Sequence, residues 1–235
     1  MKRRFRQTIT CMQGYADERG VALIVALMAM LLLTALGLAL VLSTTTETMI
    51  AGSYRNGQEA LYAAEAGIER SMPDLLAVPD WSAIPAGNMT SAFIDGPPSG
   101  SRTLPDGASL DLTQATNLAT CGKTSECSLA DINASTDDRP WGQSNPRWRL
   151  YAYGPINQLL PTGMLSSAMY VVVWVGHHQL ESGNDPAGDG SSQTNPGREV
   201  LAIRAEAFGP SGSRRVVEVT IARTRSVENE RGQGE

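Results

Sequence analysis

The sequence is poor in the residues from which catalytic and metal sites are built. Its 235 residues include two histidines, His177 and His178, and three cysteines. Adjacent residues of a strand point to opposite faces, so these histidines form a poor chelating pair, and we expect them in a surface loop. Neither a GxxxxGK phosphate loop nor a GxSxG nucleophile elbow occurs. The sequence therefore predicts no catalytic residue, cofactor or metal, and an enzyme is not expected.

One segment partly matches a calcium loop. Asp185, Asp189 and Gly190 fit its first, fifth and sixth positions. An alanine and a proline occupy the third and twelfth positions, where oxygen ligands are required. We therefore interpret residues 176–197 as a long polar loop without calcium.

Basic side chains are scarce outside the first 20 residues. Residues 1–20 hold five basic and two acidic side chains, which leaves 14 basic and 22 acidic ones in residues 21–235. Nucleic-acid binding requires clustered lysine and arginine. Nucleic acid is therefore not an expected partner.

An uncharged apolar run occupies residues 21–42. As a helix, these 22 residues would span roughly 33 Å, enough to cross a bilayer. The run is too long for a secretory signal and is followed by serine and threonine rather than a small-residue cleavage site. Basic residues precede it, so the leader should stay cytoplasmic and residues 43–235 should face outward. Hydropathy alone equally allows a plain single-pass anchor.

The cysteines fall on both sides of this run. Cys11 precedes it, whereas Cys121 and Cys127 follow it with five residues between them. An even pair in an oxidising compartment typically forms a disulfide. A metal site would need about four ligands, and no nearby side chains supply them. We expect a disulfide, with two free thiols as the alternative.

The apolar run should continue as an amphipathic helix to Met72, where Pro73 is expected to end it. Apolar and small residues alternate there in steps of four and three, which predicts one packing stripe. The stripe consists of Ile50, Tyr54, Gly57, Leu61, Ala64, Ile68, Ser71 and Leu75. We expect its outer half to pack on the protein's own sheet, and the family resemblance given below implies that its membrane-proximal half packs between subunits.

The outward domain, residues 73–225, changes character along its length. Residues 73–146 are rich in proline, glycine, serine and aspartate, which predicts loops with short elements. Four strands without intervening helices then predict an antiparallel sheet, and GPSGS suits a hairpin between the last two. The expected strands are 147–153, 168–176, 199–208 and 214–223. The tail, residues 226–235, is polar and is expected to be flexible.

Two predictions concern individual side chains of these strands. The first strand alternates Trp148, Leu150 and Ala152 against Arg147, Arg149, Tyr151 and Tyr153, which indicates a half-buried strand. Arg204 and Glu206, and Arg215 and Glu218, are expected to be solvent-facing strand charges.

The sequence ERG-VALIV at residues 18–25, followed by STTTETMIAGSYRNGQEALYAAEAGIER at 43–70, resembles a type IV pilin N-terminus. It is most similar to PilX-type minor pilins, over residues 1–72. The resemblance implies an α+β fold with a long N-terminal helix packed against a C-terminal antiparallel sheet. It also implies that a prepilin peptidase removes leader 1–20 between Gly20 and Val21 and methylates the new amine of Val21. The usual first mature residue is phenylalanine, so Val21 is a departure.

A second departure is Val25. Most pilins carry glutamate at mature position five, where it pairs with the terminal amine of a neighbouring subunit. A buried carboxylate is retained only where its partner exists. Val25 therefore favours a tip or initiating position.

The resemblance implies a minor pilin that helps initiate type IV pilus assembly at or near the tip. It would be held in the inner membrane and then incorporated into the extracellular pilus. Its expected partners are other minor pilins and the major pilin through the helix, and a tip adhesin. The alternatives are a K-type minor pseudopilin that caps a type II secretion pseudopilus, and a single-pass membrane-anchored periplasmic binding protein.

Overall fold

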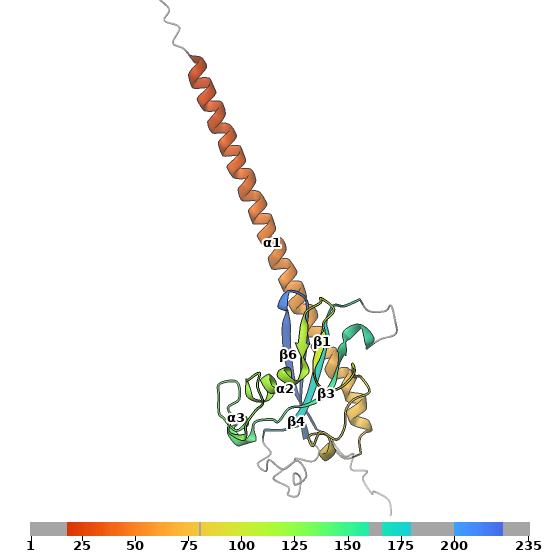
Figure 1. Ribbon diagram of the computed structural model, residues 1–235. Helices are drawn as coiled ribbons and strands as arrows, with labels where there is room; N and C mark the ends of the chain where they lie inside the picture. The colour runs from red at the N-terminus through yellow and green to blue at the C-terminus, as the bar shows by residue number, and fades with distance from the viewer. Residues whose placement is uncertain (1–17, 80, 160–165, 180–199, 223–235) are drawn as a thin grey trace, which may run out of the picture. The chain divides into compact units, whose positions relative to one another are not determined.

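The computed structural model describes residues 18–79, 81–159, 166–179 and 200–222 (Figure 1). The chain divides into two compact units, Met1–Ala51 and Gly52–Glu235, and helix α1 contributes to both. The helices are α1 (Glu18–Ala77), α2 (Leu112–Cys121) and α3 (Leu129–Ile132), with short 3-10 turns η1 (Trp81–Ala83), η2 (Gly142–Ser144), η3 (Ile156–Gln158) and η5 (Pro210–Gly212). The strands are β1 (Ser101–Thr103), β2 (Ser109–Asp111), β3 (Arg149–Pro155), β4 (Tyr170–His177), β5 (Val200–Phe208) and β6 (Arg214–Ala222).

The first unit is described from residue 18 and consists of the N-terminal part of α1. Leucine, alanine and methionine dominate its sequence, and these residues lose little freedom in a helix. α1 is apolar and long enough to cross a membrane by length and composition. Its start at Glu18 precedes the expected cleavage junction.

α1 does not end where the sequence predicted. Pro73 lies inside the helix, which continues to Ala77, so the expected end at Met72 is wrong. A proline removes one backbone donor and crowds the preceding turn, but tertiary contacts outweigh that cost here. Leu75 is completely buried in the core, and the indole N–H of Trp81 donates to its carbonyl at 2.8 Å. These contacts hold the last turn in place.

The four predicted strands form one antiparallel sheet in the order β3-β4-β5-β6. Consecutive strands pair with each neighbour, from Tyr170 opposite Phe208 in β4–β5 to Val200 opposite Ala222 in β5–β6. A register shift between Leu150 and Ala152 interrupts the β3–β4 pairing. The predicted antiparallel sheet is confirmed.

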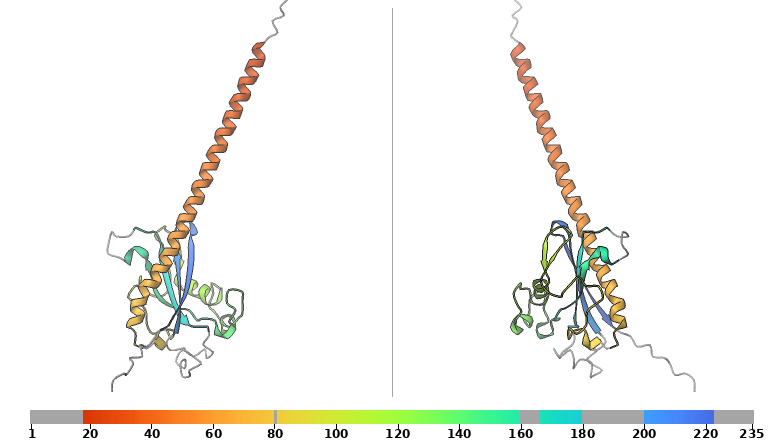
Figure 2. Two further views of the ribbon diagram at one scale, coloured as in Figure 1. Left: turned by 180° about the vertical axis from the view of Figure 1, so that it is seen from behind. Right: turned by 45° about the vertical axis from the view of Figure 1, so that its right-hand side comes forward.

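The outer part of α1 and α2 cover opposite faces of this sheet (Figure 2). The core on the α1 face contains Ala60, Ala64, Ile68 and Leu75 of the helix, with Val171, Val173, Ile203 and Ala205 of the sheet. The core on the α2 face contains Leu104, Leu112, Ala115, Ala119, Tyr170, Val172 and Trp174. The sheet is therefore the middle of three layers.

This third layer corrects the expectation for β3. Tyr151 and Tyr153, predicted to face solvent, are both buried. Tyr151 belongs to the α1-side core and Tyr153 to the α2-side core. The strand is buried on both faces because α1 covers the face of Tyr151 and the region before the strand covers the face of Tyr153, and periodicity within the strand reveals neither cover.

The free edge of β3 is also covered. The amide of Ser91 donates to the carbonyl of Tyr151 at 2.9 Å, and the amide of Tyr153 donates to the carbonyl of Phe93 at 3.0 Å. Asp74 on α1 holds this segment by accepting hydrogen bonds from the Ser91 hydroxyl and the Ala92 amide. The helix end, the connecting segment and the sheet edge are thereby fixed together.

Candidate assembly surface

The membrane-proximal part of α1 exposes its apolar side chains. Every large apolar side chain from Val21 to Ile50 is between 55% and 71% exposed. Aliphatic surface of this extent requires lipid or other helices around it. This segment is therefore the candidate surface for anchoring and assembly.

Hydroxyl groups at the outer border of this surface are satisfied within the helix. Thr44, Thr45 and Thr46 donate to the carbonyls four residues earlier at 2.8–3.0 Å, and Thr48 donates to the carbonyl of Thr44. Thr34, inside the apolar run, donates to the carbonyl of Leu31. Threonine commonly forms such backbone bonds in helices, and they leave no hydroxyl donor of these residues unused.

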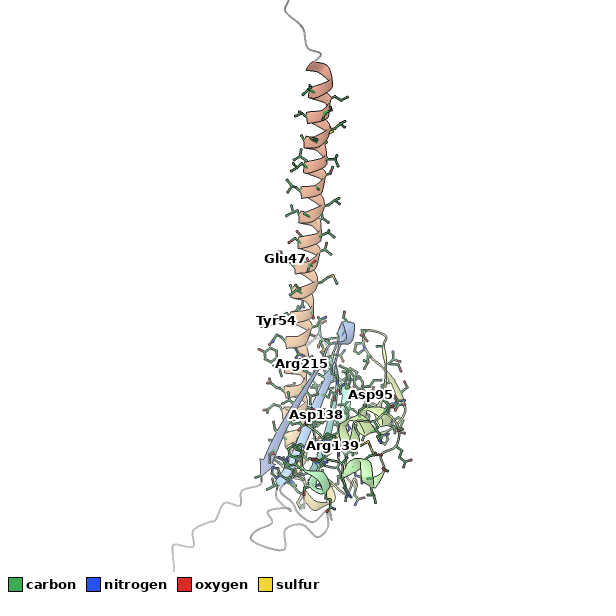
Figure 3. All side chains as sticks on the ribbon, turned by 90° about the vertical axis from the view of Figure 1, so that its left-hand side faces the viewer. Glu47, Tyr54, Asp95, Asp138, Arg139 and Arg215 are labelled. Carbon is green, nitrogen blue, oxygen red and sulfur yellow. A yellow bond between two sulfur atoms is a disulfide. The ribbon has the colours of Figure 1, made fainter. Side chains whose placement is uncertain are left out.

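The structure places the predicted processing and assembly positions on this helix. Gly20, Val21 and Val25 are all helical and exposed. No acidic side chain lies between Val21 and Leu42, and the first carboxylate after the run is Glu47 (Figure 3). The helix therefore presents an uninterrupted apolar surface at the position where pilins usually carry a carboxylate.

The predicted stripe beyond the membrane divides into two parts. Gly57, Ala64 and Ile68, together with two later members, are buried against the sheet, so the outer half is confirmed. Ile50 and Tyr54 are 64% and 70% exposed. They are therefore available for packing between subunits.

One face of α1 carries a row of small residues that the sequence analysis did not predict. Ala60, Ala64, Gly67 and Ser71 recur in steps of four and three and are all buried. Gly67 was not singled out, although this spacing of small residues was a usable signal. Side chains of minimal size allow the helix to approach the sheet closely.

Asp74 was also missed. Burial raises the pKa of its carboxyl, but hydrogen bonds from Ser91, Arg70 and the Ala92 amide outweigh burial and hold the pKa below its ordinary value. Its role depends on a partner 17 residues away, and no local pattern indicates such a contact.

The expectation of solvent-facing strand charges is wrong for Glu206. Only 1% of this residue is exposed, and its carboxylate pairs with Arg214 and Arg204. Arg204 also pairs with Glu218 on the neighbouring strand. This network lies on the sheet face that α2 partly covers, which explains why an acidic residue is buried there.

The histidine prediction is also corrected in part. His177 is the last residue of β4 and is 4% exposed, so it does not lie in a surface loop. His178 follows the strand, and burial lowers its pKa. The candidate calcium ligands Asp185, Asp189 and Gly190 lie outside the described residues. Within the described ranges, no group of three or more histidine, cysteine, aspartate or glutamate side chains could hold a metal ion.

A disulfide joins Cys121 to Cys127, with the Cα atoms 6.0 Å apart. Cys121 is the last residue of α2, and Gly122 caps the helix in the left-handed conformation with φ 74°. The loop then enters α3, where Ser128 and Asp131 form a reciprocal capping box. The bond thus links the ends of two short helices.

A long N-terminal helix with a C-terminal antiparallel sheet is the α+β layout of a pilin. Residues 19–69 match the family described as PilX N-terminal, and this confirms the resemblance to a PilX-type minor pilin. Pilins are structural subunits, and the match supports a minor pilin of the type IV pilus. No curated protein and no solved structure matches the chain.

Proposed function

We propose that this protein helps initiate type IV pilus assembly and is located at or near the pilus tip with other minor pilins. The observation that carries this proposal is the uncharged helix surface around Val25, combined with the PilX N-terminal match over residues 19–69. In the family, the missing carboxylate would neutralise the terminal amine of the adjoining subunit. A subunit without it suits a position where that contact is not made.

Processing follows the pilin scheme in this proposal. A prepilin peptidase cleaves between Gly20 and Val21 and methylates Val21, while residues 21–42 hold the subunit in the inner membrane with its globular domain in the periplasm. The helix then leaves the bilayer by packing among other minor pilins and the major pilin. A tip adhesin is the proposed partner of the outward domain. The mechanism consists of packing and involves no catalysis.

The location is tested by labelling purified pili with gold-conjugated antibody against residues 52–235. We expect label at one fibre end, and we expect deletion of the protein to reduce the number of pili. Label spread evenly along the fibres would overturn the tip position. Normal pilus number in the deletion strain, with a secretion defect instead, would favour the K-type pseudopilin.

Processing is tested by mass spectrometry of the mature N-terminus. A methylated Val21 supports the pilin class, whereas an intact Met1 favours a membrane-anchored binding protein. Gly20→Val should block cleavage because the peptidase requires a residue without a side chain there. Gly14→Val is the matched control, since it makes the same change away from the junction and should leave cleavage intact.

A further inference from the structure

Arg215, near the start of β6, has no carboxylate partner within the described part of the chain. Its Nη1 donates to the carbonyl of Arg214 at 3.3 Å, and no ion pair of the described residues includes it. Its neighbours differ, because Arg204 and Arg214 both pair with Glu206. Other arginines of the described ranges, including Arg102 and Arg149, also make no ion pair, and what distinguishes Arg215 is its position beside α1.

The guanidinium of Arg215 is placed against α1 (Figure 3). A Cβ on Gly57 would stand 3.1 Å from Nη2 of Arg215, closer than most side-chain contacts. The missing side chain at Gly57 therefore makes room for the guanidinium beside the helix. Contact with the helix restricts the arginine, which reduces the entropy cost of binding an anion.

A small polar cleft of about 260 Å³ adjoins this guanidinium. Ser53 and Asn56 of α1 line the cleft together with the turn at residues 210–213 and with Arg214, which pairs with Glu206. Hydrogen bonds from the Gly209 amide to the Ser213 carbonyl and from the Ser213 amide to the Pro210 carbonyl fix this turn. At roughly 30 Å³ for each water molecule, the volume suits the end of one side chain with a few waters. We call it the Arg215 cleft.

We propose that the Arg215 cleft receives a carboxylate from the N-terminal helix of a neighbouring pilin subunit. The inference rests on the proposed function, because only assembly brings such a helix alongside. Arginine presents a planar fork of donors that matches a carboxylate, and Ser53 and Asn56 add hydrogen-bonding groups. None of the described residues that line the cleft is acidic, so none of them competes for the guanidinium.

This chain shows what such a helix offers. Glu47 lies on α1 five positions after the apolar run ends, is exposed, and makes no ion pair with any described residue. The carboxylate of one subunit and the guanidinium of its neighbour carry opposite charges. Both lie outside the membrane when the subunits share one bilayer. Complementary charges of this kind fix register and exclude wrong partners.

A lipid headgroup is the less suitable occupant. Gly57, which Arg215 contacts, is fifteen positions beyond Leu42, the last residue of the apolar run. Fifteen helical residues rise about 22 Å, whereas the headgroup layer on each side of a bilayer is only about 5–8 Å thick. A carboxylate on the helix of a neighbouring subunit can lie this far from the membrane, because the helix extends beyond the headgroup layer.

The test uses photo-crosslinking of the full chain in piliated cells. Tyr54 is 70% exposed and adjoins Ser53 in the sequence, so its replacement by p-azidophenylalanine changes the shape little. We expect an adduct with the N-terminal helix of another pilin. Arg215→Glu should reduce its yield by about tenfold because the new carboxylate repels its partner, and Arg215→Lys should retain most of it. The same photo-reactive residue at Asp106, an exposed residue between β1 and β2, is the positional control.

The outcomes separate this inference from the proposed function. A photo-reactive residue at Met49, on the exposed part of α1, reports whether any pilin lies alongside. Adducts from Met49, combined with Tyr54 adducts that do not depend on Arg215 or that contain lipid, would overturn the cleft inference alone. Absence of pilin adducts from both positions would overturn the proposed function as well.

Discussion

Gly67 of α1 lies directly against Val171 of β4. A Cβ on Gly67 would stand 2.5 Å from Cγ1 of Val171 and 3.2 Å from Cγ2 of Val173. Real Cβ atoms essentially never come within 3.0 Å of another heavy atom, so the helix occupies this position only because residue 67 has no side chain. The outer half of α1 therefore packs so closely on the sheet that one additional carbon atom at residue 67 does not fit.

Gly67→Val should therefore destabilise the domain. Overpacking a dense core typically costs about 1–3 kcal/mol, and the contact with Val171 is backed by other buried side chains. We expect a loss of about 2–3 kcal/mol in the free energy of unfolding, because a branched side chain here displaces the helix. Urea unfolding of the full chain in detergent, followed by fluorescence of the buried tryptophans, measures it.

Gly52→Val is the matched control for that experiment. Within the described part of the chain, no atom lies within 4 Å of a Cβ at Gly52. The same substitution there should change the unfolding free energy by less than about 0.5 kcal/mol. Equal losses for the two variants would show that close packing against the sheet does not set the cost of the substitution at Gly67, because valine is the better helix former of the two residues.

The buried carboxylate of Glu206 provides a second prediction. Glu206→Gln should lower the unfolding free energy by about 2–3 kcal/mol, because it leaves the largely buried Arg204 with a weaker partner. Arg214, the other partner, is half exposed, so the loss stays below that of a fully buried pair. Glu218→Gln removes a carboxylate that is 45% exposed and should cost less than about 1 kcal/mol. A larger loss at Glu218 than at Glu206 would contradict this assignment.

The Cys121–Cys127 disulfide should stabilise the chain modestly. A loop this short constrains the unfolded state by roughly 2–3 kcal/mol in the chain-entropy view. Replacing both cysteines by serine should lower the unfolding free energy by about that amount while the sheet stays intact. Neither core cluster includes these cysteines, so far-ultraviolet circular dichroism should be unchanged. Loss of the strand signal would show that the bond is needed for folding.

Acid should loosen the α3 region before the core. Hydrogen bonds from Lys123 and Ser128 lower the pKa of the Asp131 carboxyl to about 2 from its ordinary 3.8. Because the folded pKa is the lower one, the stabilisation is complete above about pH 4 and is lost as the pH falls toward 2. The protection factors of the Leu129–Ile132 amides, relative to intrinsic exchange at each pH, should fall in that window, and Asp131→Asn should show low protection at every pH. Protection independent of pH in the unchanged protein would refute this.

The sequence predicted the sheet well because each of its strands is strongly apolar and bounded by polar loops. It also predicted the outer helix stripe, since helical spacing is visible in Ala64 and Ile68. The burial of Tyr153 was not predictable, because it depends on α2, a helix of only ten residues. Tyr151 is buried on the α1 side, after a register shift that interrupts the regular pairing of β3. Asp74 and Glu206 likewise depend on partners that only folding brings together.

The end of α1 was also predicted wrongly, because tertiary contacts decide where this helix ends. Pro73 is a local signal to stop, and reasoning from local signals placed the end at Met72. The burial of Leu75 and the hydrogen bond from Trp81 are tertiary contacts, and they extend the helix to Ala77. Local preference was outweighed by packing that the sequence does not display.

The threonines at the border of the apolar run have one further consequence. Thr44, Thr45, Thr46 and Thr48 give their hydroxyl protons to the helix itself. These hydroxyl groups therefore need no water molecule or lipid phosphate as a hydrogen-bond acceptor, whichever medium surrounds the segment. A helix that is extracted from a bilayer and inserted among other helices exchanges one solvent for another. Because these threonines donate to carbonyls of their own helix, that transfer breaks few hydrogen bonds to the surroundings.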